Sequence, residues 1–200
     1  MVHCVEQDSL SRRRSIYTLG KLPASSEKCV EEAVRVCLKN CPTAFNVQSA
    51  RVVILLGEQQ QKFWDMVNAA LKKILPAEKF KASKTRIDAF AAAHGTILFY
   101  EDKKSLTELK KRFPLYKKNM PIWMQQGNGM LQYMIWQALS ENDIGASLQH
   151  YTELVEKDVA SWLPFTKKWQ MVAQMPFGSI EQEAGEKEFL PLESRLKIIR

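Results

Sequence analysis

Three arginines between two serines form the densest group of phosphate-binding side chains in the sequence, Ser11-Arg12-Arg13-Arg14-Ser15. Guanidinium groups form paired hydrogen bonds to phosphate oxygens, and serine hydroxyls add further donors, so the run suits a phosphate dianion. A solvated surface segment or a short nucleic-acid contact has the same composition, and a solvated segment is the commonest outcome for such a run. The motif nominates a phosphate site but does not establish one.

Two amide side chains precede a predicted buried strand, in Pro42-Thr43-Ala44-Phe45-Asn46-Val47-Gln48. If this segment is extended, the alternate residues Asn46 and Gln48 point the same way. Amides carry donors and acceptors together, which suits the edge of a ring that bears both kinds of group. Turn formation at the entrance to a strand explains the same residues equally well.

The three histidines, His3, His94 and His150, are far apart, and no serine or cysteine stands in a nucleophile elbow. The sequence therefore shows no hydrolase triad. We interpret His94 as structural. His150 lies in a predicted loop after the longest helix, and loops on rigid scaffolds often carry function.

The four cysteines, Cys4, Cys29, Cys37 and Cys41, all lie in the first fifth of the chain. Cys37 and Cys41 are four residues apart, but no second pair or histidine cluster completes a metal site. Cys29 and Cys37 fall on the apolar face of a predicted helix, so we expect both thiols to be buried. No secretory signal precedes them, which favours a cytoplasmic protein without disulfides.

Aromatic residues flank the longest predicted helix, interleaved with lysines: Tyr116, Lys117, Lys118, Trp123, Tyr133 and Trp136. Such rings can stack on nucleic-acid bases, line a flat apolar pocket or belong to the core, which is their commonest place. Gly127-Asn128-Gly129 does not follow a strand and lacks the lysine of a phosphate loop. Because no G-x-G-x-x-G occurs, a dinucleotide-binding Rossmann site is disfavoured.

The spacing of apolar residues indicates which elements must position these groups. It predicts helices over Ser25–Asn40, Phe63–Ile74, Asp102–Phe113, about Ile122–Asn142 and Val155–Trp162, and strands over Arg51–Gly57, Thr96–Tyr100 and Trp169–Met175, with Arg195–Ile199 as a further candidate. Arg51–Gly57 lacks alternation, so we expect it to be buried on both faces. Helices and strands mix without regular βαβ alternation, which favours an α+β fold.

The composition limits the class of protein. The chain has 200 residues, 46% hydrophobic and 26% charged, which fits one globular domain over 1–200 and excludes a disordered or collagen-like protein. No apolar run is long enough to span a membrane. The formal net charge of +7 indicates an anionic partner, such as a phosphate cofactor, nucleic acid or an acidic membrane.

The order of these segments resembles the nitroreductase family of flavoproteins over nearly the whole chain, and most closely its short subgroup related to the fatty-acid-repression-mutant proteins of yeast. The residues that carry the resemblance are Arg13–Tyr17, Pro42–Arg51, Phe113–Tyr116, Gly129–Gln132, Gly145–Tyr151, Gln174–Gly178 and Pro191–Arg195. None is diagnostic alone, whereas their order and spacing are specific. The resemblance implies a mostly antiparallel mixed sheet flanked by helices, and a homodimer whose long central helix lies at the interface, where FMN binds.

The resemblance also implies which residues bind the FMN: Arg13, Arg14, Ser15, Tyr17, Thr43, Asn46, Gln48, Arg86, Ser147, Leu148, Gln149, His150, Lys187 and Arg195. The arginines and Ser15 would hold the phosphate and ribityl chain, joined by Arg195 or Lys187. Asn46 and Gln48 would contact the flavin and ribityl chain. The family motif opens Pro-Ser-Ser, whereas this chain has Thr43 and Ala44, so any hydroxyl contact there rests on Thr43.

A protein of this family would use NAD(P)H to reduce its flavin and then pass the electrons to a nitroaromatic, quinone or similar acceptor in a ping-pong cycle. Such a cycle needs no protein nucleophile, in agreement with the missing triad. Two other functions remain open from the sequence. One is an FMN-binding regulatory or sequestering protein with little turnover, and the other is a nucleic-acid-binding module, although the resemblance implies neither a nucleic-acid nor a membrane partner.

Overall fold

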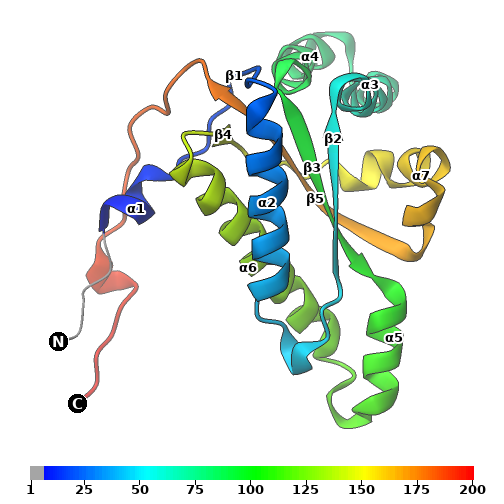
Figure 1. Cartoon of the computed structure of the whole chain (residues 1–200), viewed down its shortest axis with the longest axis vertical. Coiled ribbons are helices and arrows are strands. Elements are labelled where there is room, and N and C mark those ends of the chain that lie inside the picture. Colours follow the sequence, from blue (N-terminus) through cyan, green and yellow to red (C-terminus); the bar gives the residue numbers. More distant parts are fainter. Residues whose placement is uncertain (1–6) are drawn as a thin grey trace.

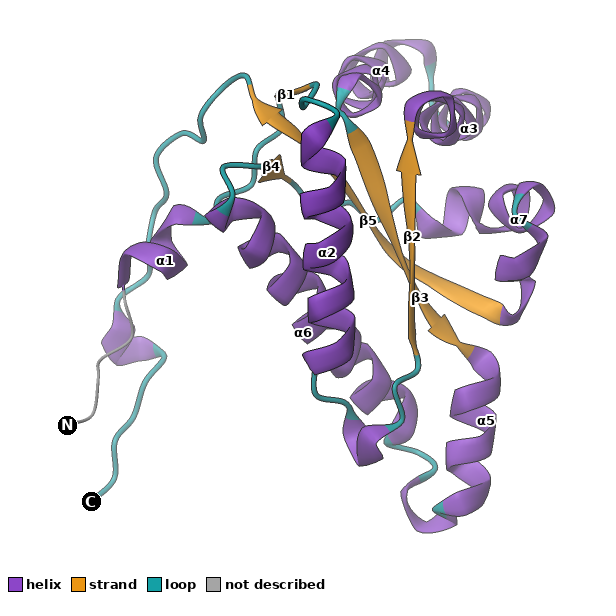
Figure 2. Cartoon of the chain, viewed as in Figure 1, coloured by secondary structure: helices purple, strands orange, loops and turns teal. Residues whose placement is uncertain are grey.

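The computed structural model describes residues 7–200. Its centre is an antiparallel sheet with the strand order β1-β5-β3-β2, and β4 pairs with β5 beside β1 (Figure 1). The helices α2 and α6 cover one face of the sheet, and α3, α4 and α7 cover the other (Figure 2). The fold is the α+β arrangement that the sequence predicts.

The elements follow in chain order. They are α1 (Gln7–Arg12), β1 (Leu19–Gly20), α2 (Ser25–Asn40), the 3-10 turn η1 (Ala44–Asn46), β2 (Ala50–Leu56), α3 (Gly57–Ile74), α4 (Ala77–Ala92), β3 (Gly95–Asp102), α5 (Lys103–Arg112), η2 (Pro114–Tyr116), α6 (Met120–Glu141), β4 (Gly145–Ala146), α7 (Thr152–Trp162), η3 (Pro164–Lys168), β5 (Trp169–Ile180) and η4 (Leu192–Ser194).

The face under α2 and α6 is held by one apolar cluster. Val30 and Val34 of α2 and Leu131 and Ile135 of α6 are all at most 4% exposed, and they pack on the β3 and β5 side chains of the same face. Their i, i+4 spacing places each pair on one side of its helix. This packing fixes α6 against the sheet along most of its length, about 33 Å at the usual rise per residue.

The opposite face is built around Trp64, which is fully buried and donates a hydrogen bond from Nε1 to Thr96 Oγ1 (2.9 Å). Its ring packs against Phe63, Phe90 and Tyr151. A buried indole N–H needs such a partner, because an unpaired donor would cost about 1–3 kcal/mol. This cluster holds α3, α4 and α7 on the sheet.

Two segments important for the site are attached to the end of β5. Gly145 and Ala146 of β4 pair with Gly178 and Phe177, and a parallel bridge joins Ser15 to Ala146. A Cβ on Gly178 would lie 2.1 Å from Gly20 O, so only glycine permits this crossing of β1 and β5. The N-terminal arm and the loop after α6 are therefore held side by side.

Four expectations for individual elements are wrong, two of them in the first third of the chain and two toward its C-terminus. The strand at Arg51–Gly57 is not buried on both faces, because it lies at the edge of the sheet; only Leu55 is buried, and Gly57 already begins α3. Cys29 is exposed, whereas Cys37 is buried as predicted. The buried stripe of α2 runs through Val30, Val34 and Cys37, and Cys29 lies about 100° around the helix from Val30, so its side chain is exposed.

The C-terminal segment Arg195–Ile199 forms no strand; it is exposed and follows the short turn η4. In contrast, β5 runs through Pro176 instead of ending at it. Pro176 pairs with Thr96 in the register, and its carbonyl accepts a hydrogen bond from Ser147 N (3.3 Å). The helix α4 carries a weak apolar stripe and was absent from the predicted elements. Within residues 7–200, no helix combines the length and apolar character needed to cross a membrane.

Candidate functional site

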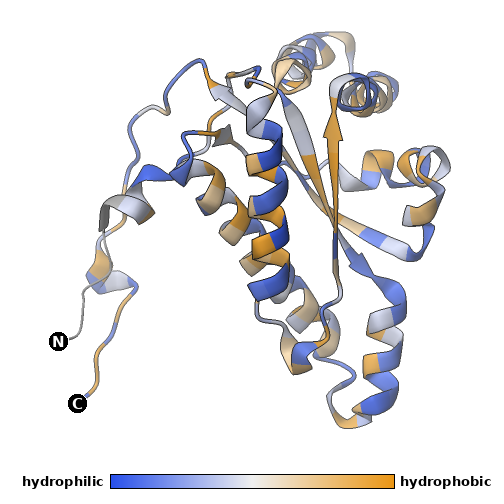
Figure 3. Cartoon of the chain, viewed as in Figure 1, coloured by the Kyte–Doolittle hydropathy of each residue, from blue (hydrophilic) through white to orange (hydrophobic). Residues whose placement is uncertain are grey.

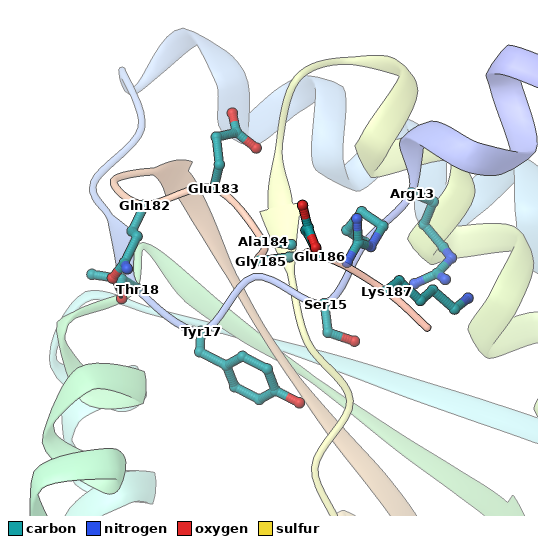
Figure 4. A pocket seen from close by; sticks show the side chains of 11 residues that line it. Arg13, Ser15, Tyr17, Thr18, Gln182, Glu183, Ala184, Gly185, Glu186 and Lys187 are labelled. Atoms are coloured by element: carbon teal, nitrogen blue, oxygen red, sulfur yellow. Dashed lines mark hydrogen bonds between the residues drawn. The ribbon is translucent and has the colours of Figure 1, made fainter. Parts of the chain in front are cut away.

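A cavity of about 400 Å³ opens between the N-terminal arm and the segment after β5. It is lined by Arg13, Arg14 and Ser15 of the run that the sequence nominated for a phosphate, by Lys187, and by the hydroxyl side chains of Tyr17 and Thr18 (Figure 4). We call Arg13, Arg14, Ser15, Tyr17 and Lys187, which all line this cavity, the phosphate cluster. Arg13, Arg14 and Lys187 also line an adjoining cavity of about 430 Å³.

The cluster is positioned by contacts with α6 and β4. The Arg13 guanidinium lies over the Trp136 ring, 4.3 Å from its centroid, and Ile16 N donates to Ala146 O (2.9 Å). Arg14 Nη2 donates to Gly185 O (2.6 Å), which ties the arm to the C-terminal segment. A guanidinium stacked on an indole keeps its edge donors available for a ligand.

The loop after β4 lies beside this cluster. Ser147 is completely buried and its hydroxyl accepts a hydrogen bond from Gln149 Nε2 (3.1 Å). The backbone of Gln149 forms two hydrogen bonds with that of Gln174, of 2.7 and 2.9 Å. Leu148 packs against the core under α2 and α6, while His150 is exposed. Because Ala146 bridges to Ser15, the structure brings this predicted loop to the phosphate cluster.

The donor set fits the phosphate and ribityl chain of a flavin mononucleotide. Two guanidinium groups, an ammonium group and a hydroxyl line one cavity, and such groups bind phosphate oxygens by charge-assisted hydrogen bonds. Glu183 and Glu186 line the same cavity and set a limit on its net positive charge. The fit therefore depends on the arginines and Lys187 outnumbering these two carboxylates.

A second group of predicted residues, Thr43, Asn46 and Gln48, lies elsewhere, at the turn before β2. We call these three residues the turn cluster. The expectation of an extended segment is wrong, because Phe45, Asn46 and Gln48 have φ angles of 54°, 51° and 49°. Thr43 Oγ1 accepts a hydrogen bond from Gln48 N (3.1 Å) and helps to hold this turn. Asn46 and Gln48 are both exposed.

Left-handed backbone at three non-glycine residues in four positions is costly, roughly 1–2 kcal/mol per residue. Strain of this kind persists only where the surroundings hold it, and it is concentrated at functional sites. Here the Phe45 ring stacks on Phe113, with centroids 4.2 Å apart, and lies near Tyr116 and Trp123. The sequence nominated Tyr116 and Trp123 as aromatic candidates, whereas Phe45 and Phe113 entered only as members of segments that carry the family resemblance.

The phosphate cluster and the turn cluster lie toward opposite ends of α6. Arg13 contacts Trp136, whereas Phe45 of the turn contacts Trp123. These positions are 13 residues apart, or about 20 Å along the helix axis. Within one chain, the predicted flavin residues therefore form two separate groups.

Arg86 and Arg195 belong to neither group. Arg86 is exposed on α4, close enough to Tyr151 for its charge to oppose the rise that burial causes in the pKa of that phenol. Arg195 is exposed, and its Nη2 donates to Leu190 O (3.2 Å) within the C-terminal segment. Lys187 is thus the C-terminal cation that lies with Arg13 in this structure.

A buried polar network joins β3 to α6. Glu101 is 4% exposed, and its Oε1 accepts a hydrogen bond from Asn128 Nδ2 (2.8 Å). Gln132 Nε2 donates in turn to Asn128 Oδ1 (2.7 Å). Burial raises the pKa of Glu101, against the opposing effects of Ser49, Asn128 and Arg51. Gly127-Asn128-Gly129 is therefore part of α6 and a structural support, in agreement with its rejection as a phosphate loop.

The remaining candidates have structural environments. His94 is buried, accepts a hydrogen bond from Leu22 N at Nδ1 (3.2 Å) and has Nε2 3.2 Å from Glu27 Oε1. Burial raises the pKa of both Cys37 and Cys41. Among the described residues, no three histidine, cysteine or acidic side chains gather as metal ligands. His3 and Cys4 lie outside those residues.

The comparisons with known proteins identify the class. The model of the nitroreductase family matches residues 10–179. This chain therefore belongs to the nitroreductase family, which is flavin-dependent, and is a nitroreductase-like oxidoreductase.

Particular relatives lie within the subgroup expected from the sequence. The chain is 34% identical over 184 residues to HBN1 of Saccharomyces cerevisiae, covering 91% of both chains. It is 32% identical over 185 residues to the nitroreductase FRM2 of the same yeast, covering 92% of both. The structure of nitroreductase CinD from Lactococcus lactis with chloramphenicol has a TM-score of 0.88 at 39% identity, over 96% of this chain and 98% of that one.

Proposed function

We propose that the chain is an FMN-dependent NAD(P)H oxidoreductase that reduces nitroaromatics, quinones or similar acceptors, and that residues 1–200 form one FMN-binding domain acting in the cytoplasm. The observation that carries the proposal is the phosphate cluster around its cavity of about 400 Å³. A structure from Desulfovibrio desulfuricans with the same fold, at 14% identity and a TM-score of 0.70, is a complex with FMN.

FMN would supply the hydride chemistry, accepting electrons from NAD(P)H and passing them to the acceptor. The residues of this chain would bind and orient. Arg13, Arg14 and Lys187 would neutralise the phosphate, while Ser15 would add a hydroxyl donor. The exposed amides of Asn46 and Gln48 would donate to the carbonyl edge of the ring, where negative charge develops, and so favour its reduction.

The separation of the two clusters supports a site shared between two subunits. Two copies of α6 packed antiparallel about a twofold axis would bring the turn cluster of one protomer to the phosphate cluster of its partner. The outer face of α6 offers apolar surface for such packing, because Ile122, Met130 and Tyr133 are 58%, 43% and 43% exposed. We therefore propose a homodimer with two composite FMN sites.

The range of acceptors is supported by relatives. Structures of CinD contain chloramphenicol and 4-nitrophenol, and the second of these has a TM-score of 0.87 at 40% identity. The exposed rings of Phe45 and Tyr116 would offer a flat apolar surface to such planar molecules.

The test uses the flavin as its own indicator. We expect the purified protein to carry FMN, to lose its visible flavin absorption anaerobically with NADH or NADPH, and to recover it with a nitroaromatic. A colourless protein that does not take up added FMN would refute the proposal. A flavin that neither donor reduces would instead identify a flavin-sequestering protein.

A further inference from the structure

The positive charge of the chain is concentrated at one end of the molecule. Residues 103–118 contain seven basic side chains and one acidic side chain, a balance of +6 against +7 for the whole sequence. These residues form α5 and the η2 loop, which project beyond the sheet (Figure 1). Figure 3 shows α5 as a largely hydrophilic helix. We call the cations of α5 and of the loop that follows it the α5 surface: Lys103, Lys104, Lys110, Lys111, Arg112, Lys117 and Lys118.

Most of this charge is not neutralised within the chain. The one acidic side chain, Glu108, is 3.6 Å from Lys104, and Asp102 at the start of α5 is directed to Arg51 (3.3 Å). Among the described residues, no carboxylate lies within ion-pair distance of Lys110, Lys111 or Arg112. A protruding group of unpaired cations attracts anions from solution and raises their rate of encounter.

A cavity of about 320 Å³ lies between α5 and the strained turn. Arg112, Ser105 and Asn46 contribute polar groups to it, and Phe45 forms part of its apolar wall. The Arg112 guanidinium also lies 5.1 Å from the centre of the Phe113 ring, which itself stacks on Phe45. The cavity thus combines a cation, a carboxylate (Glu108), a hydroxyl and an amide with an exposed aromatic ring.

Asn46 is shared by this cavity and by the turn cluster. If the turn cluster contacts the flavin of the partner subunit, as proposed above, then the α5 surface lies beside that same flavin. We propose that the α5 surface binds the phosphate groups of the nicotinamide dinucleotide donor. The flavin that this donor reduces is the one held by the phosphate cluster of the partner subunit. This inference rests on the proposed function.

The chemistry favours a dinucleotide over a larger polyanion. Arg112 is the cation of the α5 surface that lines the cavity, where Glu108 also contributes a carboxylate. The aromatic wall suits a planar base, and the unpaired cations that adjoin Arg112 along the chain, Lys110 and Lys111, suit the two or three phosphates joined to it. Nucleic-acid surfaces instead need cations distributed along a groove that follows the backbone. NADPH carries one more phosphate than NADH, so it should gain more from the α5 surface.

The test is the triple variant Lys110→Gln, Lys111→Gln and Arg112→Gln. Its matched control removes three exposed lysines from α3 and α4, Lys72→Gln, Lys73→Gln and Lys79→Gln, so that the net charge of the two proteins is equal. In the FMN-loaded protein, we expect the first variant to lower kcat/KM for NADPH about tenfold or more, within the range of electrostatic steering. The loss for NADH should be smaller, and reoxidation by an uncharged quinone should not change.

Direct binding gives a readout independent of turnover. Calorimetric titration with adenosine 2′,5′-bisphosphate should show affinity that falls with salt and is lost in the α5 variant but kept in the control. Equal affinity in both variants, or equal loss of both half-reactions, would overturn the inference. It would also be overturned if the α5 variant lost binding to duplex DNA or to phosphatidylserine vesicles while keeping the bisphosphate. If neither donor reduces the protein, the proposed function fails, and the titration still decides the role of the α5 surface.

Discussion

The phosphate cluster and the turn cluster are both expected to serve one cofactor, but they are held by different physical means. Ser15 is fixed by a bridge to Ala146, and Arg13 rests on Trp136, so ordinary pairing and packing position the first group. The second group depends on a turn with left-handed backbone, held by Thr43 and the stacked rings of Phe45 and Phe113. Strand pairing and packing thus hold the phosphate cluster, whereas tertiary contacts hold the turn cluster against backbone strain.

Loss of the phosphate cations should produce the largest effect. Charge-assisted hydrogen bonds contribute about 1.5–3 kcal/mol each. Arg13→Ala with Lys187→Ala should therefore weaken FMN binding by at least about 100-fold, since each tenfold costs about 1.4 kcal/mol. FMN affinity is measured by fluorescence titration of the apoprotein.

The control for this change is Arg35→Ala with Lys39→Ala, which removes the same charge from an exposed part of α2 and should leave FMN bound. The variant Arg13→Ala with Arg195→Ala tests the family expectation that Arg195 joins Arg13 at the phosphate. Full flavin occupancy in the double variant Arg13→Ala with Lys187→Ala would contradict the assignment of these residues to the phosphate.

Substitution of Asp102 should have the next largest effect, a loss of stability, because its side chain caps the N-terminus of α5. Its carboxylate accepts hydrogen bonds from Lys104 N and Ser105 N as the N-cap of α5, and another from Ser105 Oγ (2.6 Å). Asp102→Ala should lower the free energy of unfolding by about 1–2 kcal/mol, as for other lost caps. Urea denaturation measures the loss, and Glu58→Ala, an exposed acidic residue in the first turn of α3, is the control.

The stability from Asp102 should also depend on pH. Burial would raise the pKa of this carboxyl, but hydrogen bonds from Ser105 and Lys104 and the charge of Arg51 outweigh it and lower the pKa. The difference between wild type and Asp102→Asn should therefore be present at neutral pH and disappear as the pH falls through the pKa of the folded protein. A difference that grows on acidification would contradict this assignment.

The backbone of Phe45 gives a smaller effect with a definite sign. Glycine adopts positive φ without the cost paid by other residues. Phe45→Gly should therefore be more stable than Phe45→Ala by about 1 kcal/mol, although both lose the ring contact with Phe113. The usual order, with alanine more stable than glycine, would show that the turn is not strained.

Substitution of Glu101 should give the smallest change in the free energy of unfolding. The pH dependence of that change should have the opposite sign to that for Asp102. Because burial raises the pKa of Glu101, the folded protein favours the protonated form, and stability is lost as the pH rises from the unfolded pKa through the folded one. Glu101→Gln keeps an oxygen for Asn128 and should stabilise the protein at neutral pH. Thermal melts at acidic and neutral pH measure this difference, which should vanish at acidic pH.

The sequence predicts the phosphate cluster better than the turn cluster. Arg13, Arg14 and Ser15 are adjacent, so a local motif reveals them, whereas the short strands β1 and β4 beside them were not predicted. Lys187 lies 174 positions after Arg13 in the sequence, and only the family resemblance gave a reason to pair the two. The edge position of β2 was missed because a continuous apolar run does not distinguish a central strand from an edge strand.

The geometry of the turn was not predictable from residue types. Left-handed backbone is usually signalled by glycine or asparagine, whereas here Phe45 and Gln48 adopt it because tertiary contacts hold them. The Phe45–Phe113 stack joins residues separated by 68 positions, and no periodicity links them. The strained half of the candidate site thus depends on long-range packing that local patterns do not encode.

The shared FMN site can be tested in hybrid dimers. One subunit would carry Arg13→Ala and Lys187→Ala, and the other Asn46→Ala and Gln48→Ala, with different affinity tags for purification of the mixed dimer. If each site combines the phosphate cluster of one subunit with the turn cluster of the other, the hybrid contains one intact and one doubly altered site. We predict one FMN per hybrid dimer and almost none in either parent homodimer; a hybrid as empty as its parents would contradict the shared site.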